Sequence, residues 1–459
     1  MIRIAILILI VAAPARPADG PAQSATLERA VDAWLKPLLD EDLVSGSILI
    51  ARHGVVEVAK GYGPANREHA IPCAARTKYR IGSMTKAFTA TAVMLLQERG
   101  LLKVEDPLSK YLPDFPNGDR ITLHHLLTHT SGVINYSALP DHYRVWAMPH
   151  TMEQVIARFK DEPLRFVPGE KFEYSNSGYV LLTAVIEKVS GMAYDAFIRR
   201  NLFDPLGMRD SGMDTETAVI PGRATGHYGT GTEVIQAAYL YMPYTSGAGA
   251  LYSTVEDLYQ WDRALYTEKL LPKAALERMF TPGQGQYGYG WFIREEHGRK
   301  LIEHRGGING FVSMIQRFTD DDVTVITLFN YVSTFTREIN KGLAALALGE
   351  PVKPLLVPQG VPVDPGTLAG AVGRYRMEPG VYAVTLEGGN LFLEGPDQPR
   401  EVLVPQSEKT YYLRKGNALL HFPRETDGSI TRMIYQQSEQ MIPCPREPSG
   451  PVPAAAPKP

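Results

Sequence analysis

The chain has 459 residues, of which 44% are hydrophobic and 21% charged, and its formal net charge is -3. This composition is ordinary for a globular protein, and the length allows two domains. Because there is no surplus of basic residues, nucleic-acid binding is not expected as the function.

Residues 1–22 have the pattern of a secretory signal peptide. Arg3 precedes the apolar run 4–13, and small residues follow it. The run is too short to cross a bilayer, which takes about 20 apolar residues. Cleavage after Ala15 or Ala22 fits equally well, and an apolar first strand is the alternative interpretation. No later run is long and apolar enough for a membrane helix, so we expect a secreted or periplasmic protein.

Residues 23–349 are predicted to form one α+β domain. A long, mostly helical middle separates an early β-hairpin from a group of late strands. Strands at both ends with helices between them indicate one antiparallel sheet flanked by helices. The predicted helices lie near 27–38, 85–99, 178–189, from a capping box at 253–256, and 335–348, and the predicted strands at 47–52, 55–60, 287–295, 300–304, 311–318 and 323–329.

The C-terminal part differs in composition from the rest. Five prolines between 350 and 366 predict a linker, because dense proline disfavours helix. Residues 367–442 are predicted to form a small all-β domain, and the Pro- and Ala-rich residues 443–459 a disordered tail. The predicted strands of the β-domain lie at 382–387, 391–394, 402–404, 411–414, 418–422 and 430–435.

Cysteine and histidine spacings do not predict a metal site. The only cysteines are Cys73 and Cys444. Export would permit a disulfide between them, and two unrelated thiols are the other interpretation. His125 and His129 are four residues apart, a spacing that can bind zinc from one helix face. The residues between them include Leu126 and Leu127 and no glutamate, which indicates a helix end that faces the core.

The first of three clusters that point to chemistry is Ser83-Met84-Thr85-Lys86. A strand-like stretch meets a helix here, and the apolar stripe of that helix indicates burial. Positions three apart lie on one helix face, and a buried ammonium is costly without partners. We therefore expect Lys86 to activate the hydroxyl of Ser83, at a helix N-terminus that favours negative charge. A helix cap or turn residue is the alternative for Ser83.

The second cluster is Tyr174-Ser175-Asn176. In the functional interpretation, Tyr174 exchanges a proton with Ser83 Oγ and the leaving group. A phenol has an ordinary pKa of about 10, so as a base it needs nearby positive charge, which Lys86 would supply. Asn176 offers a donor and an acceptor to an amide-like substrate. The alternative is a tyrosine packed over the core beside a local asparagine hydrogen bond.

The third cluster is His304-Arg305-Gly306-Gly307, between two late strands. Glycines let a substrate backbone approach closely. A free N–H there, together with that of Ser83, would form an oxyanion hole. His304 and Arg305 are expected to face a substrate carboxylate. A plain β-turn is the alternative interpretation.

In this order, the clusters resemble those of the penicillin-recognising serine hydrolases, which include class C β-lactamases, D-alanyl-D-alanine carboxypeptidases and related esterases. The stretch 126–132, Leu-Leu-Thr-His-Thr-Ser-Gly, resembles a signature of the same family. The resemblance implies a β-lactamase/transpeptidase-like fold and a lipocalin-like C-terminal domain. It implies Ser83 as nucleophile, Lys86 as general base and Tyr174 as second proton-transfer group. Asn176 then matches the substrate-binding amide, and Gly307 the second oxyanion N–H.

One departure from that family concerns the third cluster. Its best-known members have Lys-Thr-Gly where this chain has His304-Arg305-Gly306. Histidine has an ordinary pKa of about 6.5 and is mostly neutral at pH 7. Carboxylate binding is then weaker or pH-dependent unless Arg305 compensates, which weakens the expectation of efficient β-lactam hydrolysis.

The sequence therefore predicts an exported serine hydrolase that cleaves an amide or ester through a Ser83 acyl-enzyme. The substrate is expected to be a small molecule or peptide, including D-amino-acid peptides, and no metal or organic cofactor is implied. The alternatives are an esterase of the same family and a penicillin-binding or sensor protein that acylates without turnover. In a further alternative, the C-terminal β-domain is the working part and holds an apolar ligand or a partner.

Overall fold

The computed structural model describes residues 21–229, 234–333, 335–377, 380–395, 400–413, 418–437 and 440–448. The signal-peptide prediction falls on residues 1–22, of which only the last two are described, as the start of helix α1 (Pro21–Asp40). Most of the predicted tail also lies outside the described residues. Within them, no helix combines the length and apolar character needed to cross a membrane.

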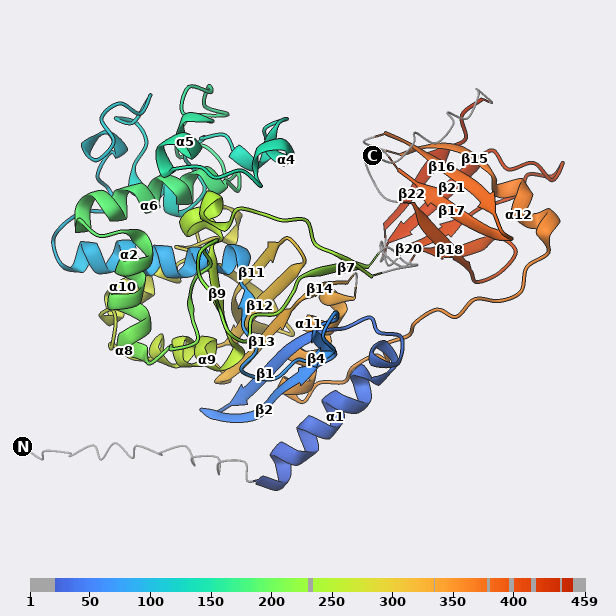
Figure 1. Ribbon diagram of the computed structural model, residues 1–459, viewed down its shortest axis with the longest axis horizontal. Helices are drawn as coiled ribbons and strands as arrows, with labels where there is room; N and C mark the ends of the chain where they lie inside the picture. The colour runs from blue at the N-terminus through green and yellow to red at the C-terminus, as the bar shows by residue number, and fades with distance from the viewer. Residues whose placement is uncertain are drawn as a thin grey trace, which may run out of the picture.

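A six-stranded antiparallel sheet organises the first domain, in the order β10-β11-β12-β13-β1-β2. The N-terminal strand β1 pairs with β13, near the end of the domain, so the two ends of the domain meet in one sheet (Figure 1). This confirms the predicted fold class. The strands are β1 (Gly46–Arg52), β2 (Val55–Tyr62), β10 (Phe292–Glu296), β11 (Arg299–Ile308), β12 (Phe311–Phe318) and β13 (Val323–Phe329).

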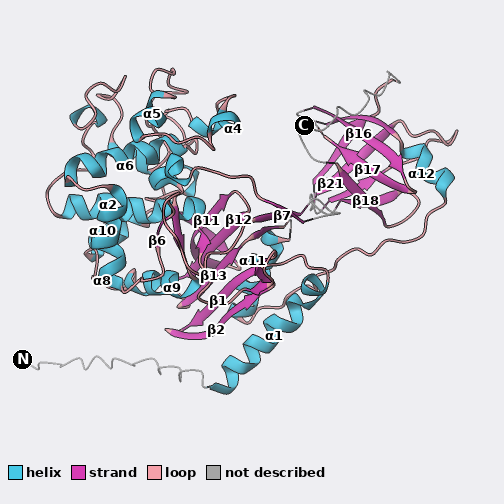
Figure 2. Cartoon of the chain, in the orientation of Figure 1, coloured by secondary structure: helices cyan, strands magenta, loops and turns pink. Residues whose placement is uncertain are grey.

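Strand β1 shows why helices must cover both faces of this sheet. Its residues from Gly46 to Ala51 are all buried. Side chains alternate between the two faces of a strand. Ile48 and Ile50 belong to the core under α1 and α11 (Thr336–Leu348), whereas Leu49 and Ala51 belong to the core on the opposite face, which includes residues of α2 (Thr85–Glu98). The result is a helix–sheet–helix sandwich (Figure 2).

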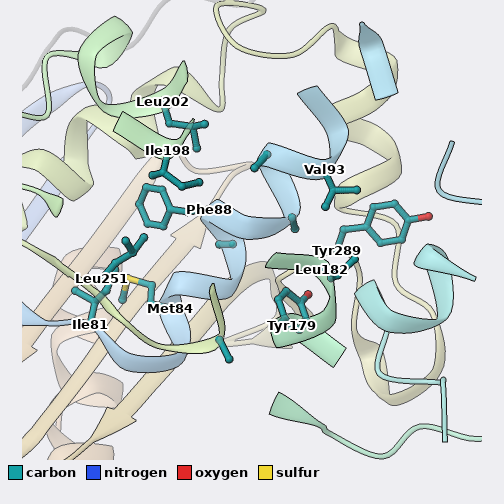
Figure 3. Close-up of a cluster of buried hydrophobic side chains, with 14 of the residues drawn as sticks. Ile81, Met84, Phe88, Val93, Tyr179, Leu182, Ile198, Leu202, Leu251 and Tyr289 are labelled. Atoms are coloured by element: carbon teal, nitrogen blue, oxygen red, sulfur yellow. The ribbon is translucent and has the colours of Figure 1, made fainter. Parts of the chain in front are cut away.

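Helix α2 passes through the middle of the larger core. Its residues from Thr85 to Leu96 are all buried, and Phe88 and Met84 lie among apolar side chains from distant segments (Figure 3). Helix α6 (Asn176–Ser190) packs beside α2 and ends at Gly191, whose positive φ of 67° closes the helix. The remaining helices of this domain are α3 (Leu123–Leu127), α4 (His142–Val145), α5 (Met152–Ala157), α7 (Tyr194–Ile198), α8 (Asp204–Leu206), α9 (Val255–Ala264) and α10 (Lys273–Met279).

Short strands complete the domain, and two details differ from the sequence analysis. Helix α9 is capped by Thr254, which accepts from the N–H of Asp257, one residue later than the predicted capping box. Strand β10 begins at Phe292 rather than 287, because the chain turns at Gly290, where φ is +79°. The short strands are β3 (Pro64–Asn66), β4 (Ile71–Pro72), β5 (Tyr79–Arg80), β6 (Gly212–Met213), β7 (His227–Gly229), β8 (Val234–Gln236), β9 (Leu251–Ser253) and β14 (Tyr331–Val332).

The C-terminal domain is an eight-stranded antiparallel sheet in simple sequence order that curls into a barrel (Figure 1). A bridge between Tyr375 and Arg446 joins its first and last strands. It has its own core, which includes Tyr375, Leu391 and Leu420. The elements are α12 (Pro365–Ala371), β15 (Gly373–Met377), β16 (Gly380–Glu387), β17 (Asn390–Glu394), β18 (Glu401–Pro405), β19 (Thr410–Leu413), β20 (Ala418–His421), β21 (Arg432–Gln437) and β22 (Gln440–Pro445).

Two boundaries here differ from the sequence analysis. Helix α12 includes the last two residues of the predicted linker, since proline is compatible with the first turn of a helix. Strand β22 includes the first three residues of the predicted tail, one of which is Cys444. Cys73 and Cys444 are both buried free thiols, so the structure contains no disulfide between them.

Candidate active site

Ser83 lies in a single 3-10 turn, Gly82–Met84, that runs directly into α2. The turn begins at Gly82, whose φ is +50°. A Cβ on Gly82 would come within 3.0 Å of the backbone of Gly307 on β11. The predicted strand-to-helix junction is therefore present, and a glycine lets β11 approach the turn that carries the hydroxyl.

Lys86 is completely buried and makes three polar contacts through its Nζ. The nitrogen lies 3.1 Å from Ser83 Oγ, 2.8 Å from Asn176 Oδ1 and 2.8 Å from the carbonyl oxygen of Ala248. Burial lowers the pKa of Lys86 well below its ordinary value. A neutral amine has two N–H groups and one lone pair, and the amide and carbonyl oxygens take the two N–H groups. The lone pair is then left for the hydroxyl proton of Ser83, as a general base requires.

Tyr174 hydrogen-bonds to Ser83 and is half-buried at the edge of a cavity. Burial raises the pKa of the phenol, and the hydrogen bond with Ser83 lowers it by less. The Lys86 Nζ lies 4.9 Å from the centre of the Tyr174 ring, over its face rather than against its oxygen. Tyr174 is thus a protonated phenol at neutral pH. That corrects the expectation that Lys86 would make it a base.

Asn176 is the first residue of α6. Both ends of its side-chain amide are hydrogen-bonded to other groups of the protein. Oδ1 accepts from Lys86, and Nδ2 donates to Ser137 Oγ at 3.2 Å. Its backbone N–H donates to Asn135 Oδ1 at 3.1 Å. The residue joins the nucleophile cluster as predicted, and these contacts show that it also holds the lysine in place.

The third cluster lies within β11 and not at its end. Strand β10 pairs with β11 only as far as Glu303, so the outer edge of β11 is free of β10 from His304 onward. A Cβ on Gly306 would lie 1.8 Å from the carbonyl oxygen of Ile81, whereas one on Gly307 would meet nothing within 4 Å. Gly306 therefore packs against the turn of Ser83, and Gly307 faces the open side.

His304 lines a cavity beside Ser83, but, contrary to expectation, its ring is not available to bind a substrate carboxylate. It is buried; its Nδ1–H donates to the carbonyl oxygen of Arg305 at 2.8 Å, and its Nε2 accepts from the hydroxyl of Tyr287 at 3.0 Å. Burial lowers the pKa of His304 to about 3, helped by the charge of Lys86. Neighbouring residues of a strand point to opposite faces. Arg305 is exposed and is a cation that can meet an anionic substrate.

Three further groups complete the site. The carbonyl of Ala248, which accepts from Lys86, lies at the end of the 3-10 helix Met242–Ala248. Tyr287 holds His304, and the ring of His129 lies 4.2 Å from that of Tyr174 at 35°. His129 Nδ1 also accepts from the N–H of Ser175 at 3.1 Å, so this histidine packs and orients the second cluster. The sequence feature that could have predicted this role of His129 is its position in the stretch 126–132, which resembles a family signature.

Two cavities meet at Ser83 and Gly307. The smaller one, of about 210 Å3, has a mixed wall, in which Asn176 and Asn309 lie beside the aromatic and apolar side chains of Tyr136, Trp146 and Leu240. The larger one, of about 730 Å3, is lined by charged residues, among them Arg305. A substrate at Ser83 would thus place an apolar group on one side of the reacting carbonyl and a polar or anionic group on the other.

An antiparallel sheet flanked by helices, with a serine beside a buried lysine and a tyrosine, defines the class of penicillin-recognising serine hydrolases. The comparison with family models agrees. The beta-lactamase family model matches residues 31–349, and the chain belongs to that family.

Relatives extend this similarity over most of the chain. It is 30% identical over 436 residues to penicillin-binding protein 4* of Bacillus subtilis, covering 86% of this chain and 94% of that protein. Among solved structures, the octameric penicillin-binding protein homologue from Pyrococcus abyssi is 27% identical with a TM-score of 0.62, covering 92% of this chain and 99% of the other. A D-stereospecific amidohydrolase from Streptomyces is 26% identical with a TM-score of 0.58, covering 66% and 94% respectively.

Proposed function

We propose that this protein is an exported serine hydrolase that cleaves an amide or ester bond through an acyl-enzyme on Ser83. The observation that carries the proposal is the setting of Lys86. A lysine with both N–H groups bonded to oxygen atoms of the protein and with its pKa depressed by burial is a base aimed at one hydroxyl.

The proposed reaction begins when Lys86 takes the proton of Ser83 as Oγ bonds to the substrate carbonyl carbon. The tetrahedral intermediate collapses and the C–N or C–O bond breaks. Tyr174, a protonated phenol hydrogen-bonded to Ser83, donates a proton to the leaving group, and the proton that Lys86 took from Ser83 then returns to the phenolate of Tyr174. Water then attacks the acyl carbon by the reverse sequence, and the acid leaves.

The negative oxygen that forms in each step would be held by the backbone N–H groups of Ser83 and Gly307. Support comes from the close approach of the turn to β11 and from the open side at Gly307. Losing one such donor typically costs about 3 kcal/mol of transition-state stabilisation.

The preferred substrate class is a small peptide or amide that contains a D-amino acid. The similarity to a D-stereospecific amidohydrolase supports this choice. The two cavities agree with it, since the aromatic one suits an apolar side chain and Arg305 in the other suits a carboxylate. Export is proposed from the pattern of residues 1–22 and is tested by the mass of the mature protein recovered outside the cytoplasm.

Turnover of a D-Ala-D-Ala peptide, its L-Ala-L-Ala isomer, a chromogenic cephalosporin and a short acyl ester tests the proposal. We expect the D-peptide to be cleaved faster than the L-isomer and all activity to vanish in Ser83→Ala. Faster turnover of the ester than of either peptide would favour an esterase. A stable adduct without turnover of any substrate would favour a penicillin-binding protein, the function in the name of the Bacillus relative.

A further inference from the structure

A second cavity of about 760 Å3 lies away from Ser83, between α10 and the ends of β11 and β12. None of its lining residues belongs to the three clusters of the active site. Arg317 of β12 lies four residues along the strand from Ser313, which bonds the carbonyl oxygen of Ile81 next to the nucleophile turn. Because a strand rises about 3.3 Å per residue, Arg317 and Ser313 are about 13 Å apart along β12. The cavity is therefore separate from the active site.

The floor of this cavity holds a buried guanidinium group. The side chain of Arg317 is 1% exposed, and its Nε donates to Asp262 Oδ1 at 2.6 Å. The other oxygen of Asp262 accepts from Thr324 Oγ1 at 2.9 Å and from Arg263 Nε at 3.2 Å. Because Asp262 is shared in this way, it does not bind Arg317 through both oxygens. Nη1 of Arg317 is buried and has no hydrogen-bond partner.

The surroundings of Arg317 favour a flat, apolar ligand body. The guanidinium carbon lies 4.8 Å from the ring centre of Tyr266 and 5.3 Å from that of Phe280. Both rings line the cavity, together with the aliphatic side chains of Leu276 and Ile302. A guanidinium group between aromatic rings, with donors to spare, is suited to a planar carboxylate.

Charges at the mouth do not oppose such a ligand. Lys273 and Lys300 are both exposed and line the cavity. Glu277 also lines it, but its carboxylate faces Lys273 Nζ at 3.7 Å and is 66% exposed. Glu268 accepts from the backbone N–H of Lys273 at 3.1 Å. Each carboxylate at the mouth thus has a partner, whereas the buried Arg317 keeps an unused donor.

We propose that this cavity, Arg317 at its floor and Phe280, Leu276 and Ile302 in its walls, binds an organic carboxylate with an aromatic or short aliphatic body. The carboxylate accepts from Arg317, and the apolar body packs between α10 and β11. This proposal does not depend on the reaction at Ser83.

Calorimetric titration of the full-length protein with benzoate and with uncharged benzamide provides the test. We expect saturable binding of benzoate and at least about tenfold weaker binding of benzamide, the factor that one charge-assisted hydrogen bond supplies. Equal affinities, or no saturable binding of benzoate, would overturn the proposal.

A matched pair of variants locates the binding. Thr319 lines the cavity two residues beyond Arg317 and is half-buried. Thr319→Glu supplies an internal carboxylate and should weaken benzoate binding at least about tenfold, whereas Thr319→Gln should leave it nearly unchanged. Unchanged affinity in Thr319→Glu would mean that benzoate binds elsewhere. If that variant folds poorly, Thr281→Glu at an exposed position of the same mouth, compared with Thr281→Gln, makes the same test.

Discussion

At the residue scale, the chemistry depends on how burial sets the protonation of three neighbouring side chains. The pKa of Lys86 falls because the ammonium loses its water, and the pKa of Tyr174 rises for the same reason. Burial also lowers the pKa of His304 to about 3. Burial therefore shifts each pKa in the direction that favours the neutral form of its group, which suits proton transfer between them.

Replacing Lys86 removes the base while leaving the nucleophile in place. Lys86→Met should lower the rate of Ser83 acylation by roughly 10²–10⁴-fold, the usual contribution of a general base. Stopped-flow acylation with a chromogenic substrate measures the rate, and Lys103→Met at an exposed position serves as the control. An acylation rate within twofold or so of the wild type would remove Lys86 from the mechanism.

The pH dependence follows from the direction of the Lys86 shift. The amine acts without its proton, so kcat/KM should rise with pH as that proton leaves and then reach a plateau. Because the pKa of Lys86 is well below 10.5, the plateau should begin well before that pH. A pH profile of kcat/KM in Lys86→Met should lose this ascending limb. Wild-type activity that still climbs at pH 10 would mean that the lysine is an ordinary ammonium.

At the element scale, the close packing of the Ser83 turn against β11 brings the first and third clusters together. Ser313 of β12 adds a hydrogen bond from its Oγ to the carbonyl oxygen of Ile81 at 2.7 Å. The adjacent strands β11 and β12 therefore both contact the turn that carries Ser83. This turn directs Ser83 toward Lys86. Gly306 and Gly307 are neighbours in β11 and face opposite ways, so Gly306 packs against the turn and Gly307 faces the open side.

Gly306 and Gly307 form a matched pair for testing this packing. Gly306→Ala puts a Cβ into the backbone of Ile81 and should destabilise the protein by about 1–3 kcal/mol, as overpacking does. Gly307→Ala points into open space and should leave the free energy of unfolding unchanged within about 0.5 kcal/mol. Urea denaturation of both variants measures the difference. Equal stabilities would mean that β11 does not support the turn.

At the scale of the whole molecule, several histidines are buried in neutral form. Burial lowers the pKa values of His129, His142 and His304. Below pH 6.5 the unfolded chain binds protons that the folded chain does not, so stability is present above that pH and falls as the pH drops further.

This predicts an acid-labile fold. Each fully neutral histidine should remove up to about 1.4 kcal/mol of stability per pH unit below 6.5. The midpoint of thermal unfolding should fall as the pH is lowered from 7.5 to 5. In His304→Gln, the number of protons that the protein takes up on unfolding should be smaller by about one, so its stability should depend less steeply on pH. A midpoint that does not change with pH would contradict the assignment of these groups as neutral.

Much of this arrangement was predictable from the sequence, for identifiable reasons. The spacing of Ser83 and Lys86 fixes their common helix face, and the hairpin and late strands follow from their alternation. The pairing of β1 with β13 and the closure by β15 and β22 depend on long-range register, which local pattern does not contain. His304 and Arg305 are both expected at a substrate carboxylate from the cluster they share, yet strand alternation places their side chains on opposite faces. The Ala248 carbonyl carries no side-chain signal.

The barrel domain shows the same limit at a larger scale. Its strands were predicted in part, but its packing was not. Tyr412 of β19 joins the core that contains Leu355 of the linker and Ile339 of α11, so the barrel and the linker contact the hydrolase domain. Such contacts depend on the outward faces of strands whose register only the folded chain reveals.

The central claim is that Ser83 forms a covalent acyl-enzyme. The most direct measurement is mass spectrometry of peptides from the protein after reaction with a mechanism-based serine-hydrolase probe. The adduct should lie on Ser83, disappear in Ser83→Ala and form much more slowly in Lys86→Met. An adduct that persists in Ser83→Ala, or that maps to another residue, would contradict the claim.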